Sequence, residues 1–429
     1  MRWGNWRPLR QKTGSFCRLS GAALGPGDSG MPPLPMSEKA AARRKIMNRS
    51  GERLRRLVWE KMARIWKTYK VLLIAAAAAL LSMLLAPPSA AYLGYLDFKV
   101  LALLFSFMMV VAGLGECGFF TVLAQRLLSG RKQLRRICLL CVLLSFFLSM
   151  MVTNDVALIT LTPFTIGVLR AIGRQDMMAY LISLQTVAAN LGSMATPVGN
   201  PQNLYLYAHY ELSFGEFFAL MAPLTLVSLA AVCLGTLWIK RETLEVRFSR
   251  RETIRSKREL ILFTGLFLLC LAAVFQLIAY QIVLALVVVC LLIRKRQLFA
   301  RVDYALLLTF VCFFIFAGNI GQVPAVHELA QRLLAEHTML GTVLASQVIS
   351  NVPAAILFSG FSDNWTGLLA GANIGGLGTL IASLASLISF GFYTKEKGAR
   401  PGRYLLIFTL LNAGGLALLL AVAAWMGIH

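Results

Sequence analysis

Charged residues, and acidic residues above all, are scarce in this sequence of 429 residues. Asp and Glu together number 19 against 42 Lys and Arg, and the four types make up only 14% of the chain, whereas 58% of it is hydrophobic. Soluble globular domains carry roughly 25% charged residues. The shortage of charge therefore argues against an ordinary soluble domain.

The sequence also lacks a metal-ligand pattern and a disulfide framework. Its four histidines are isolated, and it has no HExxH or paired Asp-rich motif of the kind that an intramembrane enzyme needs. Most of the eight cysteines lie within or beside apolar segments, where they serve as small hydrophobic residues. Cys138 and Cys141 have CxxC spacing but no second pair. We expect no enzyme activity, cofactor or metal centre, and an intramembrane enzyme is only a remote alternative.

Long apolar stretches are what the sequence has instead. Several approach or exceed the roughly 18 residues that cross a bilayer. Basic residues fall between these stretches and near the N-terminus, as in cytoplasmic loops that obey the positive-inside rule. The formal charge of +23 therefore indicates a lipid bilayer, not nucleic acid, as the partner. These features predict an all-α polytopic membrane protein.

Residues 1–70 are predicted to form a basic cytoplasmic tail. Residues 1–46 contain no apolar run, so we expect them to be disordered or to precede the true start, since Met36 and Met47 are alternative in-frame starts. From Gly51 to Lys70, apolar residues share one helical face among Arg and Lys, which predicts a basic amphipathic helix on the inner leaflet. A solvated linker is the alternative for that stretch.

One apolar segment, Ala189–Asn203, is interrupted by prolines, glycines and asparagines. Pro197 and Pro201 remove helical hydrogen bonds, so the backbone must open there. Open backbone at membrane depth is tolerated only where protein buries it or where it lines a cavity. The pattern returns at Ala372–Thr379, which matches Ala189–Thr196 at its Ala, Asn, Gly and Thr positions. Paired broken segments of this kind mark the binding site of a secondary transporter.

Each half of the chain also contains an apolar stretch that is too long for one simple span. Ile137–Leu169 has basic residues at both ends and the polar tripeptide Thr153-Asn154-Asp155 near its middle. Leu340–Phe361 contains Ser350-Asn351-Val352-Pro353 in the same way. Both stretches are predicted to be helical hairpins with the polar residues at the tip.

The two halves are predicted to run in opposite directions. The stretch from Asp97 to Leu128 parallels Asp303–Leu334, and the charge pattern makes the first copy run inward and the second outward. We expect two inverted repeats, 71–239 and 259–429, joined by the basic cytoplasmic linker 240–258. Each repeat supplies a re-entrant helical hairpin and a broken transmembrane helix, as alternating access requires.

The polar residues of the tips and breaks are the candidate site. Amides, hydroxyls and exposed carbonyls can coordinate sodium, helix N-termini suit an anion, and glycines allow close approach of the backbone. The candidates for substrate binding are Asn154, Ser193, Thr196, Asn200, Asn351 and Thr379. The candidates for ion coupling are Thr153, Asn154, Asp155, Asn190, Gly192, Ser350, Asn351, Asn373 and Gly375. Asp155 stands out, because acids inside a membrane are costly and functional by default. Capping of a helix by Asp155, and helix packing by the glycines, are the structural alternatives.

These paired tips and breaks resemble the ion transporter superfamily, which includes citrate transporters, arsenite permeases, divalent anion symporters and some sodium/proton antiporters. The resemblance covers residues 71–429 and implies a homodimer in which a transport domain moves like an elevator against a scaffold. Symporters of the superfamily place Ser-Asn-Thr at each tip, whereas the tips here end in Asp155 and Val352. The Asn-Asp pair is more similar to the arsenite permease and antiporter branches.

The function predicted from these features is secondary active transport of a small anion, either a carboxylate such as citrate or an inorganic oxyanion. Proton or sodium ions would supply the coupling. A sodium/proton antiporter that uses Asp155 is the alternative. We expect an integral protein of the plasma (inner) membrane, with its N-terminus in the cytoplasm and its C-terminus outside.

Overall fold

The computed structural model describes residues 59, 62, 69, 71–246, 248 and 251–429. The predicted tail and most of the predicted amphipathic helix lie outside the described residues. Residues Tyr69–His429 form one compact unit, which is described here by itself. Its secondary structure is helical throughout except for two short strands.

Five helices of the described residues are long and apolar enough to cross a membrane. They are α3 (Phe98–Glu116), α5 (Leu134–Met151), α9 (Phe214–Gly235), α12 (Tyr304–Gly321) and α18 (Pro401–Trp425). The first predicted span appears as the shorter helix Val71–Ser82. The helices therefore form a polytopic membrane protein.

The remaining helices are shorter or less apolar, and they include the second arm of the first predicted hairpin, both arms of the second, and the helices on either side of each predicted break. They are α2 (Tyr92–Tyr95), α4 (Phe119–Leu128), α6 (Asn154–Ala171), α7 (Met178–Ser193), α8 (Pro201–His209), α10 (Lys257–Val274), α11 (Tyr280–Arg294), α13 (Pro324–Ala335), α14 (Thr338–Ile349), α15 (Asn351–Ser359), α16 (Trp365–Ile374) and α17 (Leu384–Tyr393), with the 3-10 turns η1 (Gln175–Met177) and η2 (Arg296–Arg301).

Helices α3 and α12 open the two matching stretches of the sequence, and they begin in the same way. The side chain of Asp97 caps α3 by accepting a hydrogen bond from the Val100 N–H at 2.9 Å. Asp303 caps α12 through the Leu306 N–H at 3.0 Å. An aspartate at this position accepts from an otherwise unpaired N–H and also favours the positive end of the helix dipole. The shared Asp-aromatic pair therefore sets where both helices start.

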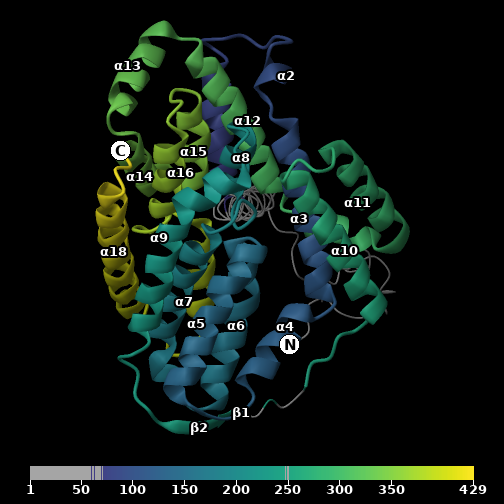
Figure 1. Cartoon of the computed structure of the whole chain (residues 1–429), viewed down its shortest axis with the longest axis vertical. Coiled ribbons are helices and arrows are strands. Elements are labelled where there is room, and N and C mark those ends of the chain that lie inside the picture. Colours follow the sequence, from purple (N-terminus) through teal and green to yellow (C-terminus); the bar gives the residue numbers. More distant parts are fainter. Residues whose placement is uncertain (1–58, 60–61, 63–68, 70, 247, 249–250) are drawn as a thin grey trace, which may run out of the picture. The chain divides into compact units, whose positions relative to one another are not determined.

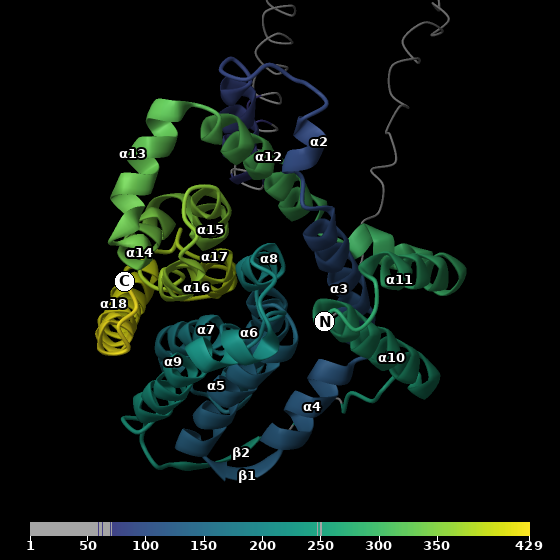
Figure 2. The same cartoon turned by 45° about the horizontal axis from the view of Figure 1, so that its top comes forward.

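The helices of the unit pack in groups. Helices α5, α6 and α7 pack together, with α9 and α18 against α7, and α14, α15 and α16 form a corresponding cluster. Helices α10 and α11 pack instead on α3, away from α5, α7 and α9 in both views (Figures 1 and 2). Helix α8 contacts α15, α16 and α3, so it joins the cluster of α14, α15 and α16 to this third group.

A two-stranded ribbon was not predicted and corrects the all-helical expectation. Strands β1 (Gly130–Gln133) and β2 (Thr243–Val246) pair antiparallel, with Arg131 opposite Glu245. They lie together at the bottom of Figure 1. The strands belong to two basic loops, one before the first hairpin and one in the linker between halves. Their pairing holds the two basic loops side by side.

Candidate functional site

The first hairpin turns at the predicted tripeptide. Helix α5 ends at Met151, Thr153 is extended, and α6 begins at Asn154. The backbone N–H of Asn154 donates to the carbonyl of Gly199 at 3.1 Å, so the tip is bound to the first break. The side-chain oxygen of Asn154 accepts from the N–H of Asp155 at 3.0 Å.

The second hairpin repeats this arrangement. Helix α14 ends at Ile349 and α15 begins at Asn351, with Ser350 between them at a positive φ of 76°. The N–H of Asn351 donates to the carbonyl of Ala382 at 3.0 Å, and its side-chain oxygen accepts from the Val352 N–H at 2.9 Å. The Ser350 hydroxyl also reaches the Ala382 carbonyl, at 3.3 Å. Each tip is therefore bound to the break of its own half.

The breaks are where the sequence placed them. In the first, α7 ends at Ser193 and α8 restarts at Pro201, whose missing N–H costs nothing at the first position of a helix. Asn200 caps α8 by accepting from the Asn203 N–H at 2.8 Å. In the second, the chain is non-helical between α16, which ends at Ile374, and α17, which begins at Leu384.

Asparagine side chains link the two breaks to each other. Asn373 of the second half accepts from the Asn200 amide at 3.0 Å and donates to the Asn203 side-chain oxygen at 2.6 Å. In the opposite direction, Asn190 of the first half accepts from the Ser383 hydroxyl at 3.1 Å and lies 3.4 Å from Ser386 Oγ. All six side chains are buried, with at most 6% exposure. We call them the inter-break network: Asn190, Asn200, Asn203, Asn373, Ser383 and Ser386.

The bonds of the inter-break network are reciprocal. In the alignment of Ala189–Thr196 with Ala372–Thr379, Asn190 matches Asn373, and its continuation matches Asn200 to Ser383 and Asn203 to Ser386. Asn373 thus bonds to Asn200 and Asn203 of the first half, and Asn190 bonds to the matching residues Ser383 and Ser386 of the second half. Asn154 adds a further bond, from its amide to the Asn190 side-chain oxygen at 3.0 Å.

Two threonines of the candidate site hold the breaks to the hairpins. The Thr196 hydroxyl donates to the Met150 carbonyl at 2.6 Å, and the Thr379 hydroxyl donates to the Gln347 carbonyl at 3.1 Å. Met150 and Gln347 stand equally far before the asparagine of their tips. Both hydroxyls are therefore engaged in positioning the hairpins, although Thr379 itself is exposed.

The two candidate glycines allow close packing of helices. A side chain at Gly192 would meet the Phe146 carbonyl at 2.1 Å and Ser149 Oγ at 2.7 Å on α5. A side chain at Gly375 would meet Ser346 Oγ at 2.7 Å on α14. Each glycine thus lets the helix before the break approach the first arm of its own hairpin, which is the packing role that small residues have in membranes.

Four residues of the site are not among the candidates predicted from the sequence: Asn203, Gln347, Ser383 and Ser386. Asn203 lies inside the interrupted stretch Ala189–Asn203, of which only Asn190 and Asn200 are predicted site asparagines. Ser386 had no visible signal, because a serine replaces the asparagine of the first half. Gln347 donates to the carbonyls of Gly375 and Leu377 at 3.0 Å each, and accepts from the Thr379 N–H at 2.9 Å. A glutamine inside an apolar helix was the available signal.

Two candidate groups remain free of protein partners. The Asp155 carboxylate makes no hydrogen bond or ion pair with any described residue. The Asn351 amide nitrogen likewise has no hydrogen bond within the described part of the chain, although Asn154 uses the same atom to bind Asn190. The two tips therefore share a backbone hydrogen bond to their breaks, but they differ in backbone conformation, with φ of −62° at Thr153 and 76° at Ser350, and in their available side-chain groups.

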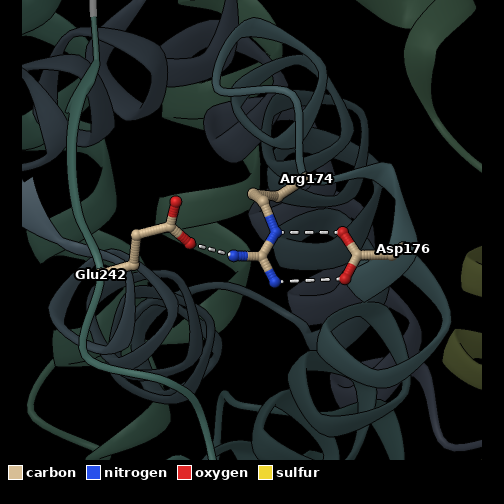
Figure 3. A network of polar contacts seen from close by, with 3 residues as sticks. All are labelled: Arg174, Asp176 and Glu242. Carbon is tan, nitrogen blue, oxygen red and sulfur yellow. Dashed lines mark hydrogen bonds and ion pairs between the residues drawn. The ribbon is translucent and has the colours of Figure 1, made fainter.

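Charged side chains pair at one edge of the unit, at the ends of these elements. Figure 3 shows Arg174, between α6 and α7, bound to both Asp176 and Glu242. Two hydrogen bonds from Arg174, at 3.1 and 3.2 Å, hold the pKa of Asp176 below its ordinary value. Arg170 at the end of α6 pairs with Glu396 in the α17–α18 loop, which links the two halves a second time.

A multi-pass helical membrane protein whose paired helix breaks meet in one buried polar network is a membrane transporter by class. The chain belongs to the citrate transporter family, because the family model described as citrate transporter matches residues 57–362. It is a transporter-family protein and not an enzyme.

Curated relatives agree with this assignment. The chain is 32% identical to an uncharacterized transporter of Methanocaldococcus jannaschii over 333 residues, which are 76% of this chain and 90% of the relative. It is 32% identical to inner membrane protein YbiR of Escherichia coli over 303 residues, which are 68% of this chain and 79% of the relative. The silicon efflux transporter LSI3 of Oryza sativa subsp. japonica is 35% identical over 140 residues, 31% of this chain and 27% of the relative.

Proposed function

We propose that this protein is a secondary active transporter that moves a small anion, coupled to protons or sodium. The observation that carries the proposal is the reciprocal inter-break network, in which each half completes the polar environment of the other. Equivalent elements from inverted repeats around one central site are the design of alternating-access transporters. We also propose that the chain consists of two inverted repeats, 71–239 and 259–429, each with a re-entrant hairpin.

The chemistry of the site favours a small anion without a fixed cationic partner. None of the residues of the tips and the inter-break network is Lys or Arg. Helices α6, α8, α15 and α17 all begin at these tips and breaks. Helix N-termini attract anions through their dipoles and unpaired N–H groups. A carboxylate such as citrate or a dicarboxylate, or an inorganic oxyanion, suits such a site, and the citrate transporter family to which the chain belongs supports the carboxylate class.

The movement that we propose is an elevator within a homodimer. The carrying body would comprise α5–α9 and α14–α18, which the inter-break network and the Arg170–Glu396 pair hold together. Helices α3, α10, α11 and α12 would form the static scaffold. We further propose an inner-membrane location with the N-terminus in the cytoplasm and the C-terminus outside, in line with the E. coli relative.

Asp155 supports a second candidate function, sodium/proton antiport. Its carboxylate lies at a hairpin tip without a hydrogen bond or ion pair to any described residue, so it is available to a proton or a cation. Acidic groups in this setting commonly serve as exchange sites in transporters.

Uptake into proteoliposomes tests both functions. The panel is labelled citrate, succinate, sulfate, phosphate and arsenite, with sodium and pH gradients imposed independently and empty liposomes as the control. Gradient-driven accumulation of one anion is the expected result. If no anion accumulates and a sodium gradient alone moves protons, as an internal pH dye reports, the antiporter is correct and the anion proposal is wrong.

A further inference from the structure

We infer that the turn after α9 and the start of α5 form a binding surface for anionic phospholipid headgroups. This headgroup surface comprises Leu237, Trp238, Lys240 and Arg241 from the turn, and Arg136 from α5. Trp238 is 89% exposed and Leu237 is 51% exposed, at the end of a helix that crosses the membrane. Lys240, Arg241 and Arg136 are exposed as well.

The headgroup surface is held in shape by backbone contacts. Arg135 donates from Nε to the Ile239 carbonyl at 3.1 Å and from its guanidinium to the Leu237 carbonyl. The N–H of Leu134 donates to the Glu242 carbonyl at 2.6 Å. The turn is therefore fastened to the first residues of α5 on both sides of Trp238. These contacts keep the backbone that carries the three basic residues next to the turn that carries Trp238.

The positive charge of the headgroup surface is not cancelled by its neighbouring acid. Glu242 follows Arg241 directly, but its carboxylate binds Arg174, as Figure 3 shows. No ion pair involves Arg136, Lys240 or Arg241 among the described residues. These three cations are therefore available to a negative group that comes from outside the protein.

A bilayer is the source of that group because of where Trp238 lies. Tryptophan prefers the level of the headgroups, where its ring is partly apolar and partly wet. Basic residues just beyond it then reach the phosphates, and each is worth about 1 kcal/mol near an anionic surface, or about fivefold in partition. A soluble anion would gain nothing from the exposed Trp238 and Leu237.

The chain contains its own matched control for this inference. Trp425 lies at the end of another membrane-crossing helix, α18, and is 85% exposed. Met426, Gly427, Ile428 and His429 come directly after it, and none of these four is Lys or Arg. Trp425 should therefore meet lipid without selecting its charge.

The test is quenching of tryptophan fluorescence by brominated lipid. The full chain is reconstituted with a minor share of either brominated phosphatidylglycerol or brominated phosphatidylcholine, and the signals of Trp238 and Trp425 are obtained by difference from W238F and W425F. Brominated phosphatidylglycerol should quench Trp238 at least about fivefold more effectively than brominated phosphatidylcholine. Trp425 should show no preference, and salt of roughly 1 M should reduce the preference of Trp238.

Substitutions then test which basic residues cause the lipid preference of Trp238. The variant R136Q/K240Q/R241Q should lose the preference at Trp238. The control R294Q/R296Q/R301Q, which removes exposed arginines at the α11–α12 connection, should keep it. Equal quenching of Trp238 by both lipids overturns the inference, and so does a preference that survives the first variant or that Trp425 shares. A thermal unfolding scan identifies any variant that fails to fold, for which K240Q/R241Q is the milder replacement.

Discussion

At the scale of single residues, Asp155 offers the sharpest prediction. Its carboxylate has no partner among the described residues, so Asp155→Asn should fold normally. Asparagine also serves well at a helix start, so a capping role would survive the change. If the carboxylate carries the coupling proton, accumulation driven by a pH gradient should be lost while counterflow exchange continues. Both are measured side by side in proteoliposomes. Unchanged accumulation in this variant would show that Asp155 has only a structural role.

The two tip asparagines should differ in stability but not in importance for transport. Asn154→Ala removes the bond to Asn190, whereas Asn351→Ala removes no equivalent bond. We therefore expect Asn154→Ala to lower the free energy of unfolding by about 1 kcal/mol more than Asn351→Ala does. Both variants should abolish uptake, because each removes a polar group from the site. Thermal unfolding in detergent and uptake at matched expression measure the two effects. Uptake by either variant at the unmutated rate would contradict a site shared by both tips.

At the scale of elements, the inter-break network should be energetically coupled. Asn200→Ala and Asn373→Ala each remove the 3.0 Å bond between the breaks, so their effects on unfolding should not add. The expected coupling is about 0.6–1 kcal/mol, the size of hydrogen bonds between membrane helices. Within the part of the chain that the structure describes, buried Asn412 of α18 bonds only to the Phe408 carbonyl of its own helix, so Asn412→Ala is the control and should add to Asn200→Ala. A coupling near zero for Asn200 and Asn373 would mean that the breaks are not held by these side chains.

Much at this scale could be predicted from the sequence, because the signals are local. Proline and glycine force the break before Pro201, and the Asp-aromatic pair predicts the starts of α3 and α12. The hydrogen-bond partners across the inter-break network could not be predicted in the same way. Ser386 replaces an asparagine, and a serine that follows an apolar run carries no sign of what faces it. The β1–β2 ribbon was missed because four-residue strands in basic loops lack the alternation that identifies a strand.

At the scale of the whole molecule, the elevator proposal depends on which helices travel together. Helix α9 packs on α5, α7 and α18, whereas α10 and α11 pack on α3. The two groups meet at Phe214, the first residue of α9, and Phe275, just after α10, whose rings lie 5.3 Å apart in an edge-on contact. Both residues line a pocket of about 660 Å³ together with Glu211 and Gln276. The Phe214–Phe275 contact is thus a place where the carrying body would slide past the scaffold.

Cross-linking can separate a moving contact from a fixed one. A short thiol-reactive cross-linker between Phe214→Cys and Phe275→Cys should arrest uptake of the anion that the proteoliposome panel identifies, because it joins the carrying body to the scaffold. The same reagent between Arg170→Cys and Glu396→Cys should leave uptake intact, because that ion pair joins two parts of one body. A linker cleaved by reductant should restore uptake in the first variant, which shows that arrest comes from the cross-link and not from the substitutions. Arrest by the second cross-link, or free uptake with the first, would exclude the division of the chain into these two bodies.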